Sequence, residues 1–336
     1  MGGSVSESHA QQGARMRGRV VKLDRGLPLV LLDDGREVRC KHAIALVKGQ
    51  QVRAVIGDGV VVRVDDDADN AQIVDIEARA NQFVRKDPAQ RTQPQVMAAN
   101  FDSVLVAHPL GELNVRRLER ELVLAHETGA HVGVVLTKSD LVDEGQAAQV
   151  LDQVKALVAP GVNVLSISEH DPASIEAVRK LIPAGQVAVL IGRSGVGKSS
   201  LVNLLAGKQV AQTTPVRETD GKGRHTTVSR TMESVEGGGH VVDMPGVRGL
   251  GLWESDYGIQ AAFPDIAQLA GSCRFRDCRH DDEPGCAVLK AVDDGTLDRV
   301  RLESYQHLVQ ENEEQQQARE EAERVRSRTG HPRRRK

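Results

Sequence analysis

The sequence predicts an α/β fold: a doubly wound, mostly parallel sheet, preceded by a small β-barrel and followed by a metal-binding helical module. Short β-rich runs fill residues 15–80, strands alternate with helices from residue 100 onward, and three cysteines lie close to a histidine between residues 273 and 286. Alternating strands and helices are typical of a parallel sheet with helices on both faces. We expect five segments: a disordered tail (1–14), an OB-like barrel (15–80), the α/β domain (81–251), a metal-binding domain with a C-terminal helix (252–323) and a basic tail (324–336).

The composition is that of a globular protein. Of 336 residues, 40% are apolar and 27% are charged, which are ordinary values for a folded chain. No run approaches the roughly 18 apolar residues that span a bilayer, and no secretory leader opens the chain. We therefore expect a monomeric, cytoplasmic protein with no membrane partner.

The net charge of −3 hides an uneven distribution of basic residues. Residues 15–63 carry eleven Lys and Arg against five Asp and Glu, and residues 324–336 carry seven basic side chains and no acid. Such patches either form a solvated face or bind phosphate backbones.

The expected strands of residues 16–80 are short and separated by turn signals such as Asp33-Asp34-Gly35 and Gly57-Asp58-Gly59. They are Gly18–Leu23, Leu29–Leu32, Arg36–His42, Gln51–Val55, Val60–Val64 and Gln72–Ile76. This pattern predicts a small barrel, and an OB-like barrel fits it best. The acidic run Asp65–Asn70 lacks the loop glycine and the closing glutamate of an EF-hand, so we interpret it as a turn.

The α/β part has strands and helices in alternation. The expected strands are Ser103–Ala107, Val132–Leu136, Val162–Ile167, Gln186–Ile191, Val228–Val235 and His240–Val242. The expected helices are Val115–His126, Gln146–Val158, Ala173–Leu181 and Lys198–Ala206. After Gly251 the chain becomes irregular, then helical through Leu289 and over Leu302–Glu323. Because the last helix is rich in Glu, Gln and Arg, we expect it to project into solvent or onto a partner.

A glycine-rich segment joins the strand Gln186–Ile191 to the helix that follows. It reads Gly192-Arg193-Ser194-Gly195-Val196-Gly197-Lys198-Ser199-Ser200 and fits the phosphate-loop pattern G-x-x-x-x-G-K-[ST] at every fixed position. Its backbone N–H groups can surround the phosphates of a nucleotide, and the helix N-terminus adds positive charge. We expect Lys198 to reach the β- and γ-phosphates and Ser199 to bind Mg²⁺. The alternative is a chance Gly-rich turn, against which the strand–loop–helix context argues.

Two further segments complete the phosphate end of this P-loop NTPase site. Asp243-Met244-Pro245-Gly246 follows an apolar strand, where the Asp can support Mg²⁺ and the N–H of Gly246 can meet the γ-phosphate. Between it and the phosphate loop, the glycine-rich stretch Gly221–Thr227 ends in two threonines. We expect either Thr226 or Thr227 to complete the Mg²⁺ shell when GTP is bound.

The candidate base-reading segment, Thr137-Lys138-Ser139-Asp140, closes the strand Val132–Leu136. Guanine-specific NTPases have [N/T]-K-x-D here, since the Asp carboxylate accepts from guanine N1–H and the 2-amino group, a pairing that adenine cannot make. Thr137 replaces the commoner Asn and is expected to lose a polar support. A later strand ends at Ser166-Ile167-Ser168, a small-residue loop expected against guanine O6. An ATP-dependent enzyme remains the alternative if Asp140 only caps a helix.

The order of these segments is rotated relative to an ordinary GTPase, in which the phosphate loop comes first. Here Thr137–Asp140 and Ser166–Ser168 precede Gly192–Ser199, and the pair Thr226/Thr227 and then Asp243–Gly246 follow. The sequence therefore predicts a circularly permuted domain. Permutation is tolerated because domain termini usually lie close together.

Three thiols and one imidazole lie within fourteen residues: Cys273, Cys278, His280 and Cys286. This is the full ligand set of a closed tetrahedral Zn²⁺ site. No open coordination position is suggested, so we expect one structural Zn²⁺ per chain, which stabilises a region too irregular to build a core of its own. The fourth cysteine, Cys40, stands alone in a strand and is interpreted as a core residue.

Together these features resemble the ribosome small-subunit-dependent GTPase family, RsgA (YjeQ), over nearly the whole chain. The residues that carry the resemblance are the basic barrel, the permuted site with Arg224-His225-Thr226-Thr227 and Asp243–Gly246, and the cysteine cluster. The resemblance implies a factor that binds GTP and GDP with Mg²⁺ and acts in late maturation of the small (30S) ribosomal subunit. It also implies contact with that subunit's rRNA, and a slow GTPase that the subunit stimulates. A GTP-dependent switch that recognises a non-ribosomal protein is the alternative.

Two departures bear on mechanism. Val247 follows Gly246, where many GTPases have the Gln that orients the attacking water, so intrinsic hydrolysis should be slow. The resemblance implies that His225 acts as a catalytic residue beside Lys198, while a loop histidine without such a role is the alternative. Residues 16–80 contain no Phe, Tyr or Trp. The barrel therefore cannot stack bases, and any RNA contact must use phosphates and shape.

Overall fold

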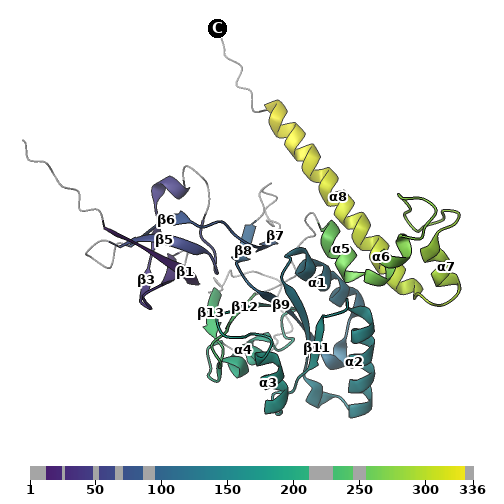
Figure 1. The fold of residues 1–336 in the computed structure, drawn as a ribbon, viewed down its shortest axis with the longest axis horizontal. Helices are drawn as coiled ribbons and strands as arrows, with labels where there is room; N and C mark the ends of the chain where they lie inside the picture. The colour runs from purple at the N-terminus through teal and green to yellow at the C-terminus, as the bar shows by residue number, and fades with distance from the viewer. Residues whose placement is uncertain are drawn as a thin grey trace, which may run out of the picture. The chain divides into compact units, whose positions relative to one another are not determined.

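The computed structural model describes residues 13–24, 27–47, 53–64, 71–85, 95–211, 230–244 and 255–329 (Figure 1). These residues form two compact units. The first contains the described chain up to Ala80 together with Ala98–Asn100 and residues 230–232, and the second contains the remainder.

The first unit is built around one long, bent strand. Its strands are β1 (Ala14–Asp24), β2 (Leu27–Leu32), β3 (Glu37–Arg39), β4 (Lys41–His42), β5 (Gly59–Val64) and β6 (Gln72–Ile76). β1 pairs antiparallel with both β2 and β5, and its far end pairs through Lys22 and Leu23 with the first residues of β13 (Arg230–Ser234). A Cβ at Gly18 would lie 2.6 Å from the carbonyl oxygen of Leu31, so the close approach of β1 to β2 at this point requires glycine.

A short run of chain closes the ring of strands. β3 pairs with β2, with Arg39 opposite Leu29, whereas β4 pairs in parallel with β6, with Lys41 opposite Gln72. Only Cys40 separates β3 from β4, so this continuous segment pairs with β2 on one side and with β6 on the other. The strands thereby close into an OB-like barrel. Cys40 is 1% exposed, which confirms its prediction as a core residue, and it packs with Val20, Val30, Val60, Val62 and Ile73.

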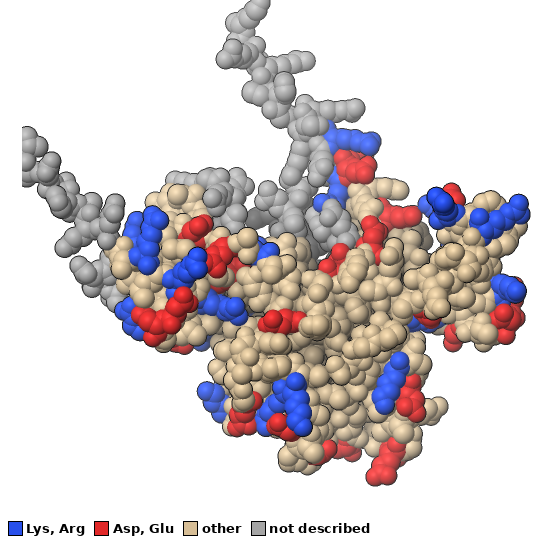
Figure 2. Space-filling view, viewed as in Figure 1, with Lys and Arg blue, Asp and Glu red and all other residues tan. Residues whose placement is uncertain are grey.

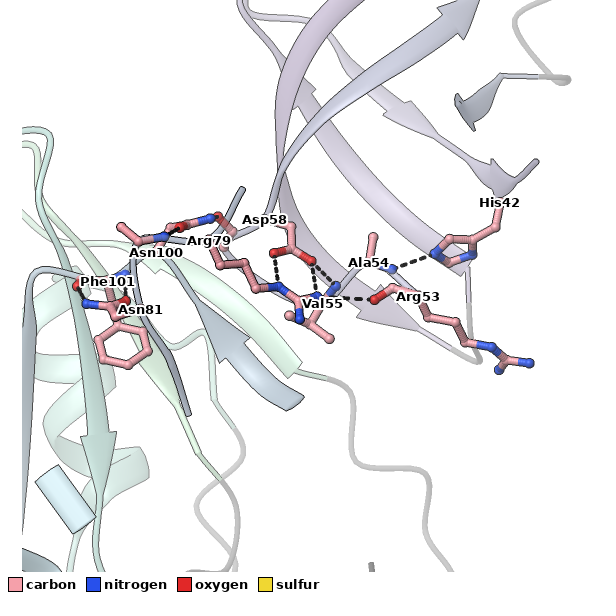
Figure 3. A network of polar contacts seen from close by, with 11 residues as sticks. His42, Arg53, Ala54, Val55, Asp58, Arg79, Asn81, Asn100 and Phe101 are labelled. Carbon is pink, nitrogen blue, oxygen red and sulfur yellow. Dashed lines mark hydrogen bonds and ion pairs between the residues drawn. The ribbon is translucent and has the colours of Figure 1, made fainter. Parts of the chain in front are cut away.

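The expected strand Gln51–Val55 is wrong in its described part, Arg53–Val55, which forms no strand. The backbone donors of this segment are taken by side chains instead (Figure 3): Ala54 N–H donates to His42 Nε2 at 2.9 Å, and Val55 N–H donates to Asp58 Oδ2 at 2.7 Å. Asp58 is fully buried, and Arg79 pairs with both of its carboxylate oxygens at 2.8 and 2.9 Å. These polar contacts fix the segment without a partner strand.

The second unit contains the parallel sheet. Its strands are β9 (Ser103–Pro109), β10 (His131–Thr137), β11 (Asn163–Ser166), β12 (Val187–Ile191) and β14 (His240–Asp243), in the order β11-β10-β9-β12-β14. All four pairings are parallel, so the carboxyl ends of the strands meet at one edge. A separate two-stranded sheet, which the sequence pattern does not predict, is formed by β7 (Gln82–Arg85) and β8 (Gln95–Ala99).

Helices cover both faces of this sheet. They are α1 (Val115–Glu127), α2 (Glu144–Leu157), α3 (Pro172–Arg179) and α4 (Lys198–Ala206), with short 3₁₀ turns at Leu110–Glu112 and Ser139–Leu141. Apolar residues of α3 and α4 form one core cluster with alternate residues of the strands, while α1 packs on β9 and β10. The side chains of Asn114, Asp143 and Asp171 accept from backbone N–H groups at the starts of α1, α2 and α3, which is the usual N-cap arrangement.

The C-terminal region adds α5 (Asp256–Ala262), α6 (Pro264–Ala270), α7 (Ala287–Asp293) and α8 (Arg299–Thr329). The first half of α8 buries Leu302, Ser304, Leu308 and Asn312. From Glu313 onward its described side chains are exposed or half-buried, and the helix extends as a single rod (Figure 1). Within the described chain, no helix combines the length and apolar character that crossing a bilayer requires.

Candidate guanine-nucleotide site and metal cluster

The phosphate-loop segment leaves β12 at the edge where the parallel strands end. Gly192 has φ +144°, and a Cβ there would lie 2.4 Å from the carbonyl oxygen of Ala107 on β9, so no other residue fits. Gly195 and Gly197 also have positive φ values, +85° and +101°. The chain can therefore turn back sharply and begin α4 at Lys198, with its first N–H groups facing the loop.

The ammonium group of Lys198 lies inside this loop. The residue is 7% exposed, and Nζ donates to the carbonyl oxygens of Gly192 at 3.0 Å and Arg193 at 3.2 Å. Burial lowers the pKa of Lys198, an effect that the negative charges of Asp243 and Glu121 oppose. A poorly solvated cation held in this way is well suited to bind a polyphosphate.

Ser199, at the start of α4, and Asp243, at the end of β14, form a second set of polar contacts beside the phosphate loop. Ser199 Oγ donates to Asp243 Oδ2 at 3.4 Å, whereas Asp243 Oδ1 is buried without a hydrogen-bond partner. Burial raises the pKa of Asp243, and the charge of Lys198 and the hydroxyl of Ser199 oppose that effect. An unpaired buried carboxylate oxygen beside a hydroxyl is a donor set that fits Mg²⁺.

A pocket of about 180 Å³ lies beside the phosphate loop. Residues of three segments line it: Thr137, Lys138, Asp140 and Leu141; Ile167 and Glu169; and Gly197, Ser200, Leu201 and Leu204. Lys138 adopts the left-handed conformation, φ +59°, and its Nζ donates to the carbonyl oxygen of Gly195 at 3.0 Å. Ser139 N–H donates to the carbonyl oxygen of Ile167 at 3.1 Å. The fold thus brings the base-reading segment, the Ser166–Ser168 loop and the phosphate loop together, as the sequence predicts.

Thr137 keeps the polar support that it was expected to lose, so that expectation is wrong. Its Oγ1 lies 2.5 Å from the carbonyl oxygen of Val196 in the phosphate loop and 3.2 Å from that of His108 on β9. The residue is 3% exposed. A hydroxyl is therefore long enough to join β10 to the loop at this position, because the two backbones approach closely.

Some expected site residues lie elsewhere or outside the described chain. Ser139, Ser166 and Ser168 do not line the pocket; Ser168 N–H instead donates to Ser174 Oγ, and Ser168 Oγ accepts from His170 N–H at 3.0 Å. His225, Thr226, Thr227, Gly246 and Val247 lie outside the described residues. Four pocket residues are not predicted from the sequence, although each either directly follows a motif or lies on one face of α4: Leu141, Glu169, Leu201 and Leu204.

The cysteine cluster is assembled as predicted. The ligand atoms of Cys273, Cys278, His280 and Cys286 all lie within 4.8 Å of one another. Cys273 Sγ is 3.9 Å from Cys286 Sγ and 3.7 Å from His280 Nδ1. Ligands at about 2.3 Å from a tetrahedral zinc are about 3.8 Å apart, so the distances from Cys273 to Cys286 and His280 are close to those of such a site. His280 is 3% exposed and takes a left-handed backbone, φ +59°, which turns its ring towards the thiols.

Comparison with known proteins agrees with this geometry. A family model described as RsgA GTPase matches residues 76–253, and one described as 50S ribosome-binding GTPase matches residues 187–322. A Streptomyces coelicolor protein named small ribosomal subunit biogenesis GTPase RsgA is 41% identical over 297 residues, 88% of this chain and 80% of the relative. A protein of the same name from Methanosarcina acetivorans is 35% identical over 304 residues, 90% of this chain and 81% of its own.

Two solved structures share the fold. The crystal structure of YjeQ from Thermotoga maritima superposes with a TM-score of 0.65 at 26% identity, covering 87% of this chain and 96% of its own. YloQ, described as a circularly permuted GTPase, gives 0.63 at 22% identity and covers 91% and 98%. With the strand β10 and Thr137–Asp140 ahead of the phosphate loop, and a matching family model over more than half of its length, this chain belongs to the RsgA GTPase family and hydrolyses GTP.

Proposed function

We propose that this GTPase acts in late maturation of the small (30S) ribosomal subunit in the cytoplasm, and that the subunit raises its slow intrinsic activity. The observation that carries the proposal is the extent of the similarity. Relatives named for small ribosomal subunit biogenesis align over 88–90% of the chain, so the likeness includes the barrel and the cysteine cluster as well as the nucleotide site.

The site residues are proposed to divide the nucleotide between them. Asp140 pairs with guanine N1–H and the 2-amino group, the Lys138 stem lies along the ring, and the loop of Ile167 lies near O6. The phosphates lie against Gly192–Ser200, and Lys198 counters the charge that develops in the transition state. The Mg²⁺ ligands are Ser199, Asp243 through water, and either Thr226 or Thr227, while Gly246 N–H meets the γ-phosphate. Mg²⁺ itself would neutralise charge on the β- and γ-phosphate oxygens.

His225 is proposed to orient the attacking water, since Val247 cannot hydrogen-bond it. His225→Ala should lower subunit-stimulated turnover by roughly a hundredfold, as loss of a general base does. GTP affinity should stay within twofold of wild type, because His225 is assigned no part in binding. Wild-type stimulation of the variant would show that His225 is an ordinary loop residue.

The barrel is proposed to contact rRNA through phosphates. Arg15, Arg17 and Arg19 alternate along β1 and are all exposed, so they project from one face of the strand. On the face drawn in Figure 2, Lys and Arg side chains cover part of the barrel, with Asp and Glu side chains among them. Regular spacing of basic side chains suits a phosphate backbone, and such binding should weaken steeply with added salt.

The cluster of Cys273, Cys278, His280 and Cys286 is proposed to hold one structural Zn²⁺. The ion would cross-link a loop that has little apolar core of its own. Metal analysis of protein purified without chelators should find one zinc per chain, and a value near zero would contradict the proposal.

The deciding experiment measures GTP hydrolysis by the full chain with purified small subunits, with large subunits and with neither. We expect strong stimulation by small subunits alone and none for Lys198→Ala. Equal rates in all three conditions would refute the ribosomal role and favour a switch with a non-ribosomal protein partner. A matched titration with ATP, expected to bind far more weakly than GTP or GDP, tests the reading of guanine by Asp140.

A further inference from the structure

A buried hydrogen bond between a histidine and a carboxylate lies next to the phosphate loop. His108 is the penultimate residue of β9, and Glu121 lies in the middle of α1, which packs on that strand. His108 Nε2 is 2.6 Å from Glu121 Oε2, and the two residues are 2% and 4% exposed. None of the sequence motifs includes either residue.

Two contacts and one charge interaction place this pair next to the loop. The carbonyl of Ala107, the residue before His108, touches Gly192 so closely that a Cβ would lie 2.4 Å from its oxygen. The His108 carbonyl oxygen is 3.2 Å from the Thr137 hydroxyl that also meets the loop. The charge of Glu121 acts on Lys198, whose protonated form it favours. The pair therefore belongs to the surroundings of the loop lysine.

The charge of Glu121 creates a conflict at this position. Lys198 has two carboxylates in its surroundings, Asp243 and Glu121. Asp243 has a task at the Mg²⁺ site, whereas a free Glu121 carboxylate would repel the phosphates of GTP and compete with them for the lysine. In the structure Lys198 Nζ donates to the carbonyls of Gly192 and Arg193, and the Glu121 carboxylate is held by His108.

We propose that His108 is a positioning residue of the GTPase: by holding the carboxylate of Glu121, it keeps Lys198 available to the β- and γ-phosphates of GTP. His108 does not touch the nucleotide itself and acts through Glu121. The inference rests on the proposed role of Lys198 and adds the group that keeps this lysine available.

The test compares GTP dissociation constants, KM and kcat of the full chain with His108→Leu, Glu121→Gln and the double variant His108→Leu/Glu121→Leu. His108→Leu, similar in volume, leaves the carboxylate unpaired and should raise Kd and KM at least tenfold, with kcat at saturation within threefold. The double variant removes the competing charge as well and should return Kd to within threefold of wild type. A purely structural role predicts instead a lower free energy of unfolding in His108→Leu, with the GTP Kd of the folded variant unchanged.

Glu121→Gln keeps the proposal testable if His108→Leu fails to fold. Its Kd for GTP should be no more than threefold above that of wild type. A tenfold higher Kd in this folded variant would overturn the proposal. Unchanged Kd in a folded His108→Leu, or no recovery in the double variant, would do the same. His126→Leu on the same helix is the matched control and should bind normally. If Lys198→Ala binds GTP like wild type, the proposed role of Lys198 fails too; if it does not, only the inference about His108 is at stake.

Discussion

A single hydroxyl proton links the base-reading strand to the phosphate loop. Thr137 Oγ1 is 2.5 Å from the Val196 carbonyl oxygen and is buried. Thr137→Val keeps the shape but leaves that acceptor unpaired, at a cost of about 1–3 kcal/mol. We expect roughly tenfold weaker GTP binding in a calorimetric titration, and Thr137→Ser within twofold of wild type. Equal affinity of the Val and Ser variants would show that the hydroxyl contributes only packing.

The pH response of the barrel should depend on His42. Its Nε2 accepts from Ala54 N–H, so the ring is neutral there, and burial with the nearby charge of Arg53 lowers the pKa of His42 below 6.5. Folding favours the neutral ring, so His42 contributes to the free energy of unfolding at pH values above its unfolded-state pKa. This contribution is lost as the pH falls through the folded-state pKa. Hydrogen exchange of Ala54 N–H should therefore be protected at about pH 7 and less so near pH 5.

His42→Gln supplies the control for this dependence. Its amide oxygen can accept the same bond but does not titrate, so protection, after correction for intrinsic exchange rates, should change little over the same range. An identical pH dependence in both proteins would exclude His42 as the titrating group.

At the scale of elements, Arg301 joins three helices. From α8 it bonds Glu119 of α1 at 2.9 Å and Asp265 of α6 at 2.5 Å, and its guanidinium lies 4.7 Å from the centre of the Phe263 ring. Glu119 is 1% exposed, and burial raises the pKa of its carboxyl, with Ser304 and Arg301 opposing. Arg301→Leu leaves this carboxylate without its cation and with the Ser304 hydroxyl as its remaining named partner, so we expect a loss of about 3–5 kcal/mol in the free energy of unfolding.

Two variants test this assignment by denaturant unfolding. Arg301→Leu/Glu119→Leu should recover most of the loss, since an apolar pair can replace a buried ion pair. Arg116→Ala removes a similar but exposed pair with Glu303 and should cost less than about 1 kcal/mol. A loss in Arg301→Leu as small as that in Arg116→Ala would contradict the assigned role.

The elements also show where sequence reasoning reaches its limit. The strands and helices around the nucleotide site were predictable because apolar periodicity and glycine punctuation agree there. The strand expected at Gln51–Val55 is wrong in its described part because side chains of His42 and Asp58, from outside the segment, take the backbone donors of Ala54 and Val55. α8 begins at Arg299, three residues before the expected Leu302. The expectation was late because a buried arginine, Arg301, cannot be told from a surface residue by its hydropathy. The support from Thr137 depends on a loop 59 residues away and has no local signal.

At the scale of the whole molecule, loss of metal should loosen the C-terminal module and leave the affinity for GTP unchanged. Cys286→Ser leaves three of four ligands, and an incomplete shell should loosen the loop around His280 and the start of α7. We expect faster hydrogen exchange over residues 273–293 and GTP affinity within twofold of wild type. Unchanged exchange would argue against a bound ion, and loss of GTP binding would argue against the predicted domain boundary near residue 251.

Because the barrel closes through the segment around Cys40, insertions and deletions are tolerated in some parts of the barrel and not in others. Because β3 and β4 are one run that pairs with β2 on one side and β6 on the other, both pairings depend on a fixed spacing. One inserted residue would turn every following side chain to the opposite face, and one of the pairings would have to open. Connections that join a single strand pair, of which the β2–β3 turn (residues 33–36) is one, carry no such double constraint, and they absorb extra residues at little cost. Insertions and deletions among relatives should therefore collect in those connections and be missing between Glu37 and His42.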